Sequence, residues 1–538
     1  MSYRSILIPA LLSGTMLSPA FAAEVPAGTN LAAEQVFTYR VLDEFSSFDP
    51  QVVEDVLGSE VVRDLFEGLY NQDADGNNVP GVALSHTVSD DNMVYTFTLR
   101  EDAKWSDGKP VTAGDFVYAW QRAVTPELAS PYAWYMELMS IENASAIIAG
   151  EKPVTDLGVS APDDRTLVVN LSQPLPYFAK MVTHATTFPA PKWAIEAHGK
   201  EWTRPENIVS NGAYKLTEHV LKERSVRERN PMYWDNDKTV IEKVVTLNIG
   251  DEAQALTRYR AGEVEKTDIP AGQYPSLKEE LPDEAYALPR LCNYYFTYNV
   301  VSGPEAFKDA RVRQALSYAI DRNVIVDAVL QGGQFPAYTF TPGATANFEV
   351  PEVAYATMTQ AERDEKAKEL LAEAGYGPDG EKLAFTYLYN TSDSHQQIAI
   401  VATQMWKQKL GVEVTLENQE WKVFLETRGN QNFDMARGAW CGDYNEASTF
   451  LDLLTTPSGY NDGKYSNARV DELMTEAKSS QDTTPLYAEV EQILADEMPV
   501  VPVYHYSTNI MLKDTIKGWP IHNVEQNWYS KDLYKVAE

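Results

Sequence analysis

The alternation of apolar and polar positions along the chain predicts a mixed α/β protein with no internal repeat. Several short runs alternate apolar and polar residues, as strands that are buried on one face do. Longer stretches repeat apolar residues every three or four positions, which indicates helices with one buried face. The predicted strands are 36–42, 92–100, 166–171 and 412–417, with a buried pair of strands in 498–512, and the predicted helices lie in 113–124, 309–320, 359–377 and 394–411.

Local signals mark the ends of these elements. Thr112, with Asp115 three positions later, is close to a capping box and predicts that a helix begins there. Gly375 and Gly377 are expected to end the third of the predicted helices. A helix, a glycine and a strand follow one another over 394–417. That order favours an α/β layer with parallel strands.

The first 22 residues have the features of a cleavable export signal. Arg4 is followed by an apolar stretch, Ile6–Leu17, that is too short to span a bilayer. Ala20-Phe21-Ala22 then supplies the small-x-small cleavage pattern, so we expect cleavage after Ala22. No later apolar run approaches the roughly 18–20 residues of a spanning helix. The sequence therefore predicts a soluble mature chain that is exported to a Gram-negative periplasm.

The charge and length of the chain restrict its class. The 78 acidic and 45 basic residues give a formal net charge of -33. Such a chain is repelled by nucleic acid and by anionic membranes, so neither is expected as a partner. Its 538 residues exceed one ordinary domain and predict two or three. The 30 tyrosines and 11 tryptophans serve core packing first, but such an excess of amphipathic rings is also typical of a large ligand cleft.

The chain contains two cysteines, Cys292 and Cys441. In an oxidising compartment a disulfide between them is the default, and two buried free thiols are the alternative. The bond would close a loop of about 150 residues, for which the chain-entropy model gives roughly 5 kcal/mol. Both cysteines lie in aromatic-rich runs with the pattern of strands, which is compatible with a bond between neighbouring strands.

Several motifs of enzymes and metal sites are absent. The sequence contains no G-x-S-x-G, H-E-x-x-H or P-loop motif, and its seven histidines show no metal-ligand spacing. The run Asp73–Asn78 resembles the start of a calcium loop, but Leu84 stands where that loop needs a glutamate. A plain Asp-Gly turn is the preferred interpretation. These absences favour a binding protein without metal or cofactor over an enzyme.

One carboxylate, that of Asp443, follows an apolar run that contains glycine, Ala436–Gly442. In such surroundings it either caps the turn before Tyr444 and Asn445 or binds a positive charge. The local sequence leaves both interpretations open.

Five segments resemble the substrate-binding proteins of peptide-importing ABC transporters, in order and over nearly the whole chain from about Phe37. Pro80–Arg122 resembles the signature region of that family, and the other four segments are Ser210–Leu216, Arg229–Asp235, Asp309–Arg322 and Trp440–Glu446. The resemblance implies a two-lobed α/β fold of the periplasmic binding protein type with an extra inserted domain. It also implies that the ligand is buried between lobes that close about a hinge.

The resemblance further implies domains that are built from separate segments of the chain. After the signal peptide, 1–22, the first lobe is expected to combine 23–57, 186–291 and 509–538, the inserted domain to span 58–185, and the second lobe to span 292–508.

By resemblance, Asp443 forms a salt bridge with the free α-ammonium group of a bound peptide. A buried carboxylate left without such a partner is costly, on the order of 3–5 kcal/mol, so a ligand with a blocked N-terminus is disfavoured. The peptide main chain is expected to pair as an added strand with two segments of the protein. These segments contribute Glu44, Phe45 and Ser46 from the run Asp43–Ser47, and Gly438, Ala439, Trp440 and Cys441 from the run Gly438–Gly442, whose glycines allow close approach of two backbones.

The C-terminal carboxylate of the peptide is expected to meet cations, by the same resemblance. The matching residues, used at different ligand lengths, are Arg437, Arg428 and His395. Val326–Gln334 holds no basic residue where close relatives use a lysine for longer peptides, which puts longer ligands in doubt. Aromatic cleft positions are matched by Tyr118, Trp440, Tyr504 and Tyr506, and a disulfide by Cys292 and Cys441, with Cys292 about three residues before its expected place.

Together these features predict a monomeric receptor that binds short peptides largely independently of their side chains and delivers them to a membrane ABC permease. A receptor for a dedicated solute, such as murein tripeptide or a dipeptide, is the nearest alternative. An exported peptidase and a chaperone-like binder of unfolded chains are the alternatives from other classes.

Overall fold

A computed structural model describes residues 23–377 and 380–537, so the predicted signal peptide lies outside the described residues. Its largest element is a mixed sheet with the strand order β15-β14-β16-β12-β17-β11-β1-β10-β9-β8, and β13 pairs with β17. The strands are β1 (Val36–Val41), β8 (Tyr214–Val220), β9 (Arg224–Arg229), β10 (Lys243–Asn248), β11 (Lys266–Asp268), β12 (Ala285–Tyr298), β13 (Phe335–Pro336), β14 (Ala384–Asn390), β15 (Glu413–Gln419), β16 (Met435–Cys441) and β17 (Val500–Leu512).

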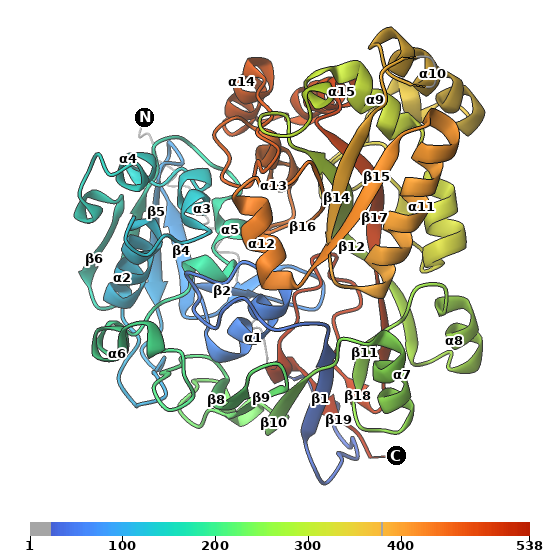
Figure 1. Ribbon diagram of the computed structural model, residues 1–538. Coiled ribbons are helices and arrows are strands. Elements are labelled where there is room, and N and C mark those ends of the chain that lie inside the picture. Colours follow the sequence, from blue (N-terminus) through green and yellow to red (C-terminus); the bar gives the residue numbers. More distant parts are fainter. Residues whose placement is uncertain (1–22, 378–379, 538) are drawn as a thin grey trace, which may run out of the picture.

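Two long strands, β12 and β17, join the upper and lower parts of this sheet (Figure 1). The segment Cys292–Tyr298 of β12 also pairs with β16 in the upper part, whereas Ile510–Leu512 of β17 pairs with β11 in the lower part. Between these regions the β12–β17 ladder is irregular, from Pro289 to Asn293. The chain therefore forms two α/β lobes that share two strands, a connection about which lobes can close.

A third part of the molecule lies beside the lobes, at the left of Figure 1. Its core is a separate antiparallel sheet with the order β4-β5-β7-β6. The indole N–H of Trp120, a buried side chain of α2 in this part, donates to the Thr187 carbonyl at 2.8 Å.

The short strands of the whole molecule are β2 (Tyr70–Gln72), β3 (Asn78–Pro80), β4 (Ala83–Val88), β5 (Val94–Leu99), β6 (Val159–Asp163), β7 (Thr166–Asn170), β18 (Ile516–Lys517) and β19 (Tyr534–Lys535).

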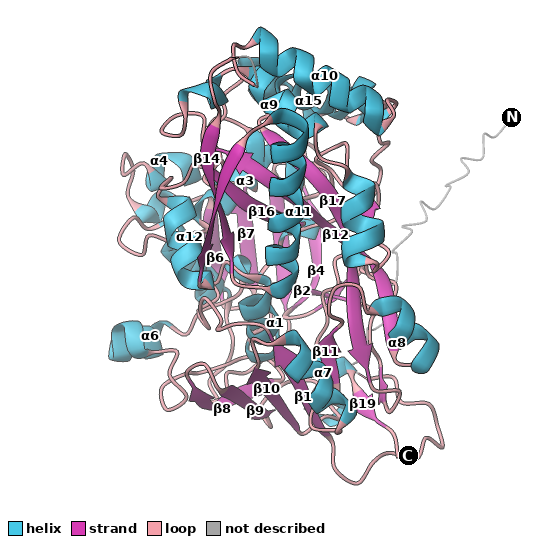
Figure 2. Cartoon of the chain, turned by 45° about the vertical axis from the view of Figure 1, so that its right-hand side comes forward, coloured by secondary structure: helices cyan, strands magenta, loops and turns pink. Residues whose placement is uncertain are grey.

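Helices cover the sheets, and Figure 2 shows α11 lying along the upper part of the large sheet. The helices are α1 (Val56–Leu65), α2 (Ala113–Val124), α3 (Ala133–Leu138), α4 (Ala144–Ile148), α5 (Phe178–Met181), α6 (Lys192–His198), α7 (Glu252–Arg260), α8 (Tyr274–Glu280), α9 (Ala310–Tyr318), α10 (Gln360–Glu373), α11 (Asp393–Leu410), α12 (Trp421–Gly429), α13 (Ser448–Leu451), α14 (Ala468–Ala477) and α15 (Thr484–Glu497). The predicted architecture, two α/β lobes with an extra inserted domain, is confirmed; the exact domain boundaries stay a prediction.

The local signals in the sequence explain where the helices begin and end. At the start of α2 the Thr112 N–H donates to the Asp115 carboxylate at 2.8 Å. Helix α10 ends just before Gly375, whose φ of +89° favours glycine. Strands β14 and β15 pair in parallel, as the order of elements predicted. The expected strand pair in 498–512 is wrong, because Val500–Leu512 finds a partner in β12 along its length and stays one strand.

Candidate functional site

A cavity of about 380 Å³ lies where the two lobes and the inserted domain meet. This volume is within the range of small-molecule sites. Its charged and aromatic lining residues include Arg40, Asp43, Glu54, Asp55, Glu60, Arg63, Tyr132, His184, Lys266, Asp268, Arg290, His395, Trp421, Arg428, Arg437, Trp440, Asp443, Tyr460, Tyr506, Trp519, Glu525 and Trp528.

Asp443 lines this cavity just beyond the end of β16. Its side chain is 8% exposed, and among the described residues Oδ2 has no hydrogen-bond partner. Oδ1 accepts a long hydrogen bond, 3.4 Å, from the hydroxyl of Tyr132. Burial raises the pKa of the Asp443 carboxyl well above its usual range, against the effect of the Tyr132 bond, and the charge of Glu525 raises it further. No backbone N–H of the described chain bonds this carboxylate, so the structure does not contain the turn cap that was the alternative interpretation.

His184 lies next to Asp443 without neutralising it. Its Nε2 is 3.5 Å from Asp443 Oδ1. Burial, helped by the charge of Arg63, lowers the pKa of His184 to about 3, so the ring is neutral near pH 7. Within the part of the chain that the structure describes, no lysine or arginine lies within 4 Å of this carboxylate. The site is therefore suited to an external cation such as an ammonium group.

Glu525 is a second carboxylate at this end of the cavity, and sequence analysis missed it. The Leu291 N–H donates to the Val524 carbonyl at 2.6 Å, and the Gly442 N–H donates to the Leu291 carbonyl at 2.8 Å. These backbone contacts bring the segments of Glu525 and Asp443 together. Burial raises the pKa of Glu525 to about 7. No local pattern marks this residue, because its position depends on contacts between segments that are distant in sequence.

Arg437, on β16, is a cavity-lining cation with no carboxylate within 4 Å among the described residues, as are Arg63, Lys266 and Arg290. Its Nη2 donates to the Tyr506 hydroxyl at 3.0 Å, and the guanidinium carbon lies 5.2 Å from the centre of the Tyr294 ring. The residue is 7% exposed and its Nε has no partner in the described chain. A buried guanidinium in such neutral surroundings is suited to an incoming carboxylate.

The other two predicted cations differ from Arg437. His395 lies in the first turn of α11, where burial, together with the charge of Arg437, lowers its pKa well below the usual range and keeps the ring neutral. Arg428, on α12, already holds a carboxylate: its Nε is 2.7 Å from Asp462 Oδ2, and both side chains are buried. All three residues line the cavity, but they are not equivalent.

The strand between Arg437 and Asp443 has a free edge. Strand β16 pairs with β12 over its whole length, but with β14 only at Met435 and Ala436. Beyond Ala436 no described strand covers that second edge, and Ala439, Trp440 and Cys441 line the cavity there. A free strand edge inside a cleft can pair with the main chain of an extended ligand.

The glycines of this strand have a structural reason to be glycine. A Cβ on Gly438 would lie 2.3 Å from the Tyr295 ring, and a Cβ on Gly442 would lie 2.7 Å from Leu291. Both neighbours belong to β12. The glycines thus make room for β12 side chains, a constraint that sequence analysis attributed to a ligand.

Of the N-terminal run Asp43–Ser47, only Asp43 lines the cavity. The side chains of the predicted contacts point to neighbouring protein groups: Glu44 accepts from the Lys222 N–H at 2.6 Å, Ser46 Oγ donates to Asp55 at 2.8 Å, and the Phe45 ring lies 5.4 Å from Phe48. Their main-chain contacts to a ligand stay a prediction.

Of the four predicted cleft aromatics, two line the cavity and two do not. Trp440 and Tyr506 line the cavity, whereas Tyr504 does not and stacks on Tyr294 with ring centres 4.8 Å apart. Tyr118 lies outside the cavity lining, on α2, 5.6 Å from Lys192 Nζ. Tyr132 and His184, from the inserted domain, occupy the site that sequence analysis gave to other rings.

The disulfide between Cys292 and Cys441 is confirmed. The two residues face each other in the β12–β16 ladder, with Cα atoms 4.0 Å apart. Cys292 lies about three residues before the place expected from the family, but this offset does not reflect a shifted register between β12 and β16. The bond ties β12, which both lobes share, to the strand that carries Arg437 and leads to Asp443.

Over residues 23–377 and 380–537, no group of three His, Cys, Asp or Glu side chains has the arrangement to hold a metal ion. None of the helices in these ranges is long and apolar enough to cross a membrane.

Comparisons with known proteins agree with this architecture. The model of the bacterial extracellular solute-binding proteins, family 5, matches residues 77–462. The periplasmic oligopeptide-binding protein OppA of Salmonella typhimurium is 46% identical, with 99% of this chain and 98% of that protein covered. Haemophilus influenzae OppA in complex with the peptide RPPGFSPFR is 39% identical, with a TM-score of 0.90 and 94% of this chain and 100% of that chain covered.

A third relative shows two arrangements of its lobes. The structure of the murein tripeptide binding protein MppA of Escherichia coli is 44% identical, with a TM-score of 0.92 and 95% of this chain and 100% of that chain covered. Its unliganded open form, at the same identity and with 95% and 99% covered, gives a TM-score of 0.69. The lobes of the present structure are therefore arranged differently from that open form. The chain belongs to the bacterial extracellular solute-binding proteins of family 5.

Proposed function

We propose that this protein is a periplasmic receptor that binds short peptides and delivers them to an ABC permease for import. The observation that carries the proposal is a pair of buried, opposite charges, Asp443 and Arg437, neither of which has an oppositely charged partner within 4 Å in the described chain. They lie at the two ends of one free strand edge. A zwitterion with a main chain between its charges complements both.

The spacing fits a short extended ligand. Asp443 follows Arg437 by six positions, so at about 3.3 Å per residue their Cα atoms are at most on the order of 20 Å apart. The two side chains shorten this span further. In the proposed complex Asp443 binds the α-ammonium group, Arg437 binds the C-terminal carboxylate, and the edge of β16 pairs with the peptide main chain. Because every peptide offers the same main-chain groups, affinity depends little on side chains.

The cellular role follows from the family and the predicted export signal. OppA and MppA are periplasmic proteins by name, and the first 22 residues of this chain carry the pattern of a cleavable export signal. The protein acts by binding and release, with closure of the lobes around the ligand, and not by catalysis.

Native mass spectrometry of the gently purified mature protein tests this proposal. Heterogeneous adducts with masses of two to five amino acids are the expected result. A single adduct mass would instead indicate a dedicated ligand, such as murein tripeptide. Absence of any peptide adduct, together with no binding of added peptides in calorimetry, would overturn the proposal.

A second measurement separates a receptor from a peptidase. The protein is incubated with a free-amine tripeptide, which is then recovered by denaturation and analysed by chromatography. A receptor returns the peptide intact in the amount added. Fragments that accumulate with time would assign the cleft to a peptidase.

A further inference from the structure

Two arginines of the second lobe face the same cavity but have opposite surroundings. Arg437 contacts the Tyr506 hydroxyl and the Tyr294 ring, which are neutral groups. Arg428 is 2.7 Å from Asp462, with side chains that are 8% and 10% exposed. In a buried position such a pair is strong, and a ligand carboxylate has to compete with a carboxylate that is already in place.

Two further acids, Glu54 and Asp55, lie just before α1 and contact residues near Arg428. The Tyr460 hydroxyl donates to Glu54 Oε2 at 3.1 Å, and the Trp421 indole donates to Asp55 Oδ2 at 3.1 Å. Tyr460 precedes Asp462 by two positions, and Trp421 begins the helix that carries Arg428. The Arg428 guanidinium thus pairs with Asp462 and acts on the charge of Glu54, and Asp55 acts on Glu54 in turn.

The pKa shifts agree with this crowding. Burial raises the pKa of Glu54, and of the charges around it Asp55 and Asp462 raise it while Arg428 lowers it. Burial also raises the pKa of Asp462, while Arg428 lowers it. A further carboxylate, brought by a ligand, would enter a region that already holds the buried acids Glu54 and Asp462.

We infer that Asp462 is a specificity-determining residue: it occupies Arg428, so of the two second-lobe arginines that line the cavity only Arg437 is open to a ligand carboxylate, and the cleft prefers the short peptide length that reaches Arg437. The inference rests on the proposed function, since it concerns which peptides the same cleft accepts. Asp462 acts through Arg428 and does not need to touch the ligand.

Calorimetry with free alanine peptides of two, three, four and five residues tests the inference on the mature protein. Wild type is expected to bind one length at least about tenfold more tightly than the others. Asp462→Asn keeps a hydrogen-bond acceptor for Arg428 but removes the charge. It should raise the affinity for a different length about tenfold relative to the preferred one, and adding Arg428→Met should abolish that gain.

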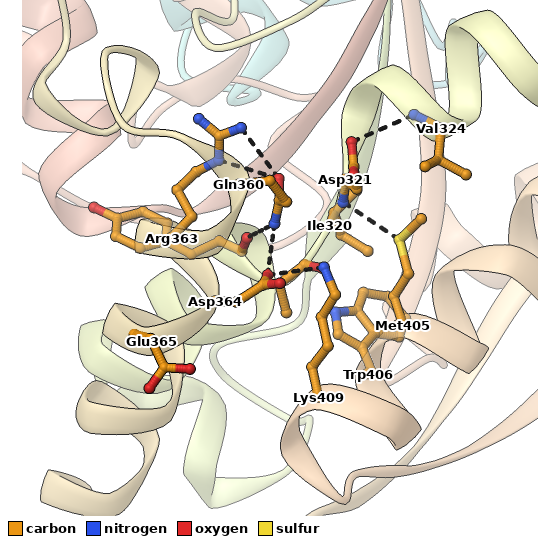
Figure 3. A network of polar contacts seen from close by, with 12 residues as sticks. Ile320, Asp321, Val324, Gln360, Arg363, Asp364, Glu365, Met405, Trp406 and Lys409 are labelled. Carbon is orange, nitrogen blue, oxygen red and sulfur yellow. Dashed lines mark hydrogen bonds and ion pairs between the residues drawn. The ribbon is translucent and has the colours of Figure 1, made fainter.

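A matched control comes from another ion pair of the second lobe, remote from the cavity lining. Lys409 on α11 lies 2.8 Å from Asp364 on α10, and Figure 3 shows this pair within its own polar network. Asp364→Asn should leave the length profile unchanged. A uniform change at all lengths in Asp462→Asn, no change, or a gain that persists without Arg428 would overturn the inference.

The wild-type protein decides the question if Asp462→Asn does not fold. Amidation of the peptide C-terminus should reduce affinity most at the length whose carboxylate reaches Arg437, because Asp462 already occupies Arg428. Equal sensitivity to amidation at two or more lengths would overturn the inference. If wild type binds none of these peptides, the proposed function fails first; if it binds them but the length profile ignores Asp462, only this inference fails.

Discussion

Buried charges in the first lobe and in the cleft differ in one respect, the presence of a partner. Arg227, on β9 of the first lobe, and Asp64, on α1, are 0% and 1% exposed and lie 3.2 Å apart. Arg227 also donates to the Tyr39 and Thr246 hydroxyls, and Asp64 accepts from the Ser530 N–H and hydroxyl. Each charge of this pair has its opposite charge without any ligand, although Arg227 Nε and Nη1 make no hydrogen bond in the described chain.

The cleft holds Asp443 and Arg437 at similar burial, but neither has an opposite charge within 4 Å in the described chain. Removing one partner of a complete buried pair leaves a stranded charge and destabilises the fold. Removing an unpartnered charge removes a penalty from the free protein and an attraction from the complex. The comparison thus separates charges that maintain the fold from charges that bind.

The largest effect should come from the complete pair. Asp64→Ala leaves the Arg227 guanidinium buried without its carboxylate, and the free energy of unfolding should fall by about 3–5 kcal/mol. Chemical denaturation of the ligand-free protein measures this. The exposed pair Lys366 and Glu369 supplies the control, since Glu369→Ala should change stability little. Equal effects of the two substitutions would contradict the comparison.

Asp443→Ala should act on binding and not on folding. The affinity for a free-amine tripeptide should fall by roughly 3 kcal/mol or more, because the ammonium group loses the carboxylate proposed to bind it. The unfolding free energy of the ligand-free protein should stay the same or rise. Calorimetry and denaturation give the two values, with the N-acetylated tripeptide as the matched ligand. A binding loss under about 1 kcal/mol would remove Asp443 from the site.

Arg437→Met should weaken binding of the same tripeptide by about 1.5–3 kcal/mol, the range for hydrogen bonds to a charged group. The loss should nearly vanish for the C-amidated tripeptide, because that ligand brings no carboxylate. A loss of equal size for both ligands would mean that Arg437 contributes to the shape of the cleft and does not bind the ligand carboxylate.

The smallest expected effect is the pH dependence of the cleft. The Asp443 carboxyl has a pKa above the value of about 3.9 that it has in the unfolded chain, so its ionisation costs stability. The ligand-free protein should therefore lose stability as the pH rises from about 3.9 to the raised pKa of Asp443. The pH dependence of peptide affinity should have the opposite sign. The affinity for a free-amine peptide should rise with pH, by about tenfold per unit at most, until the peptide amine loses its proton near pH 8.

Matched variants separate the groups that titrate there. Asp443→Asn should flatten both pH profiles. Glu525→Gln is measured beside it, because burial places the pKa of Glu525 at about 7, within the same range. His184, with a pKa of about 3, should contribute nothing between pH 5 and 8. A profile unchanged by Asp443→Asn would assign the titration to other groups.

Local sequence predicted the elements that depend on local signals. The capping contact of Thr112 and the glycine after α10 lie within a few residues of the helices they limit. The prediction failed for 498–512, where apolar residues suggested two strands. One continuous strand forms there because β12 offers a partner along its length, and no residue within the run encodes that.

What the sequence determined by itself is the placement of Asp443, Arg437 and Cys441 within seven residues, because a strand and the turn after it keep near neighbours in order. Tertiary structure alone decided which charges are free. Asp462 reaches Arg428 from a loop 34 positions away, and backbone contacts through Leu291 bring Glu525 beside Asp443. The free energy of a buried charge depends on every group within a few ångströms, and those groups come from segments that only the fold brings together.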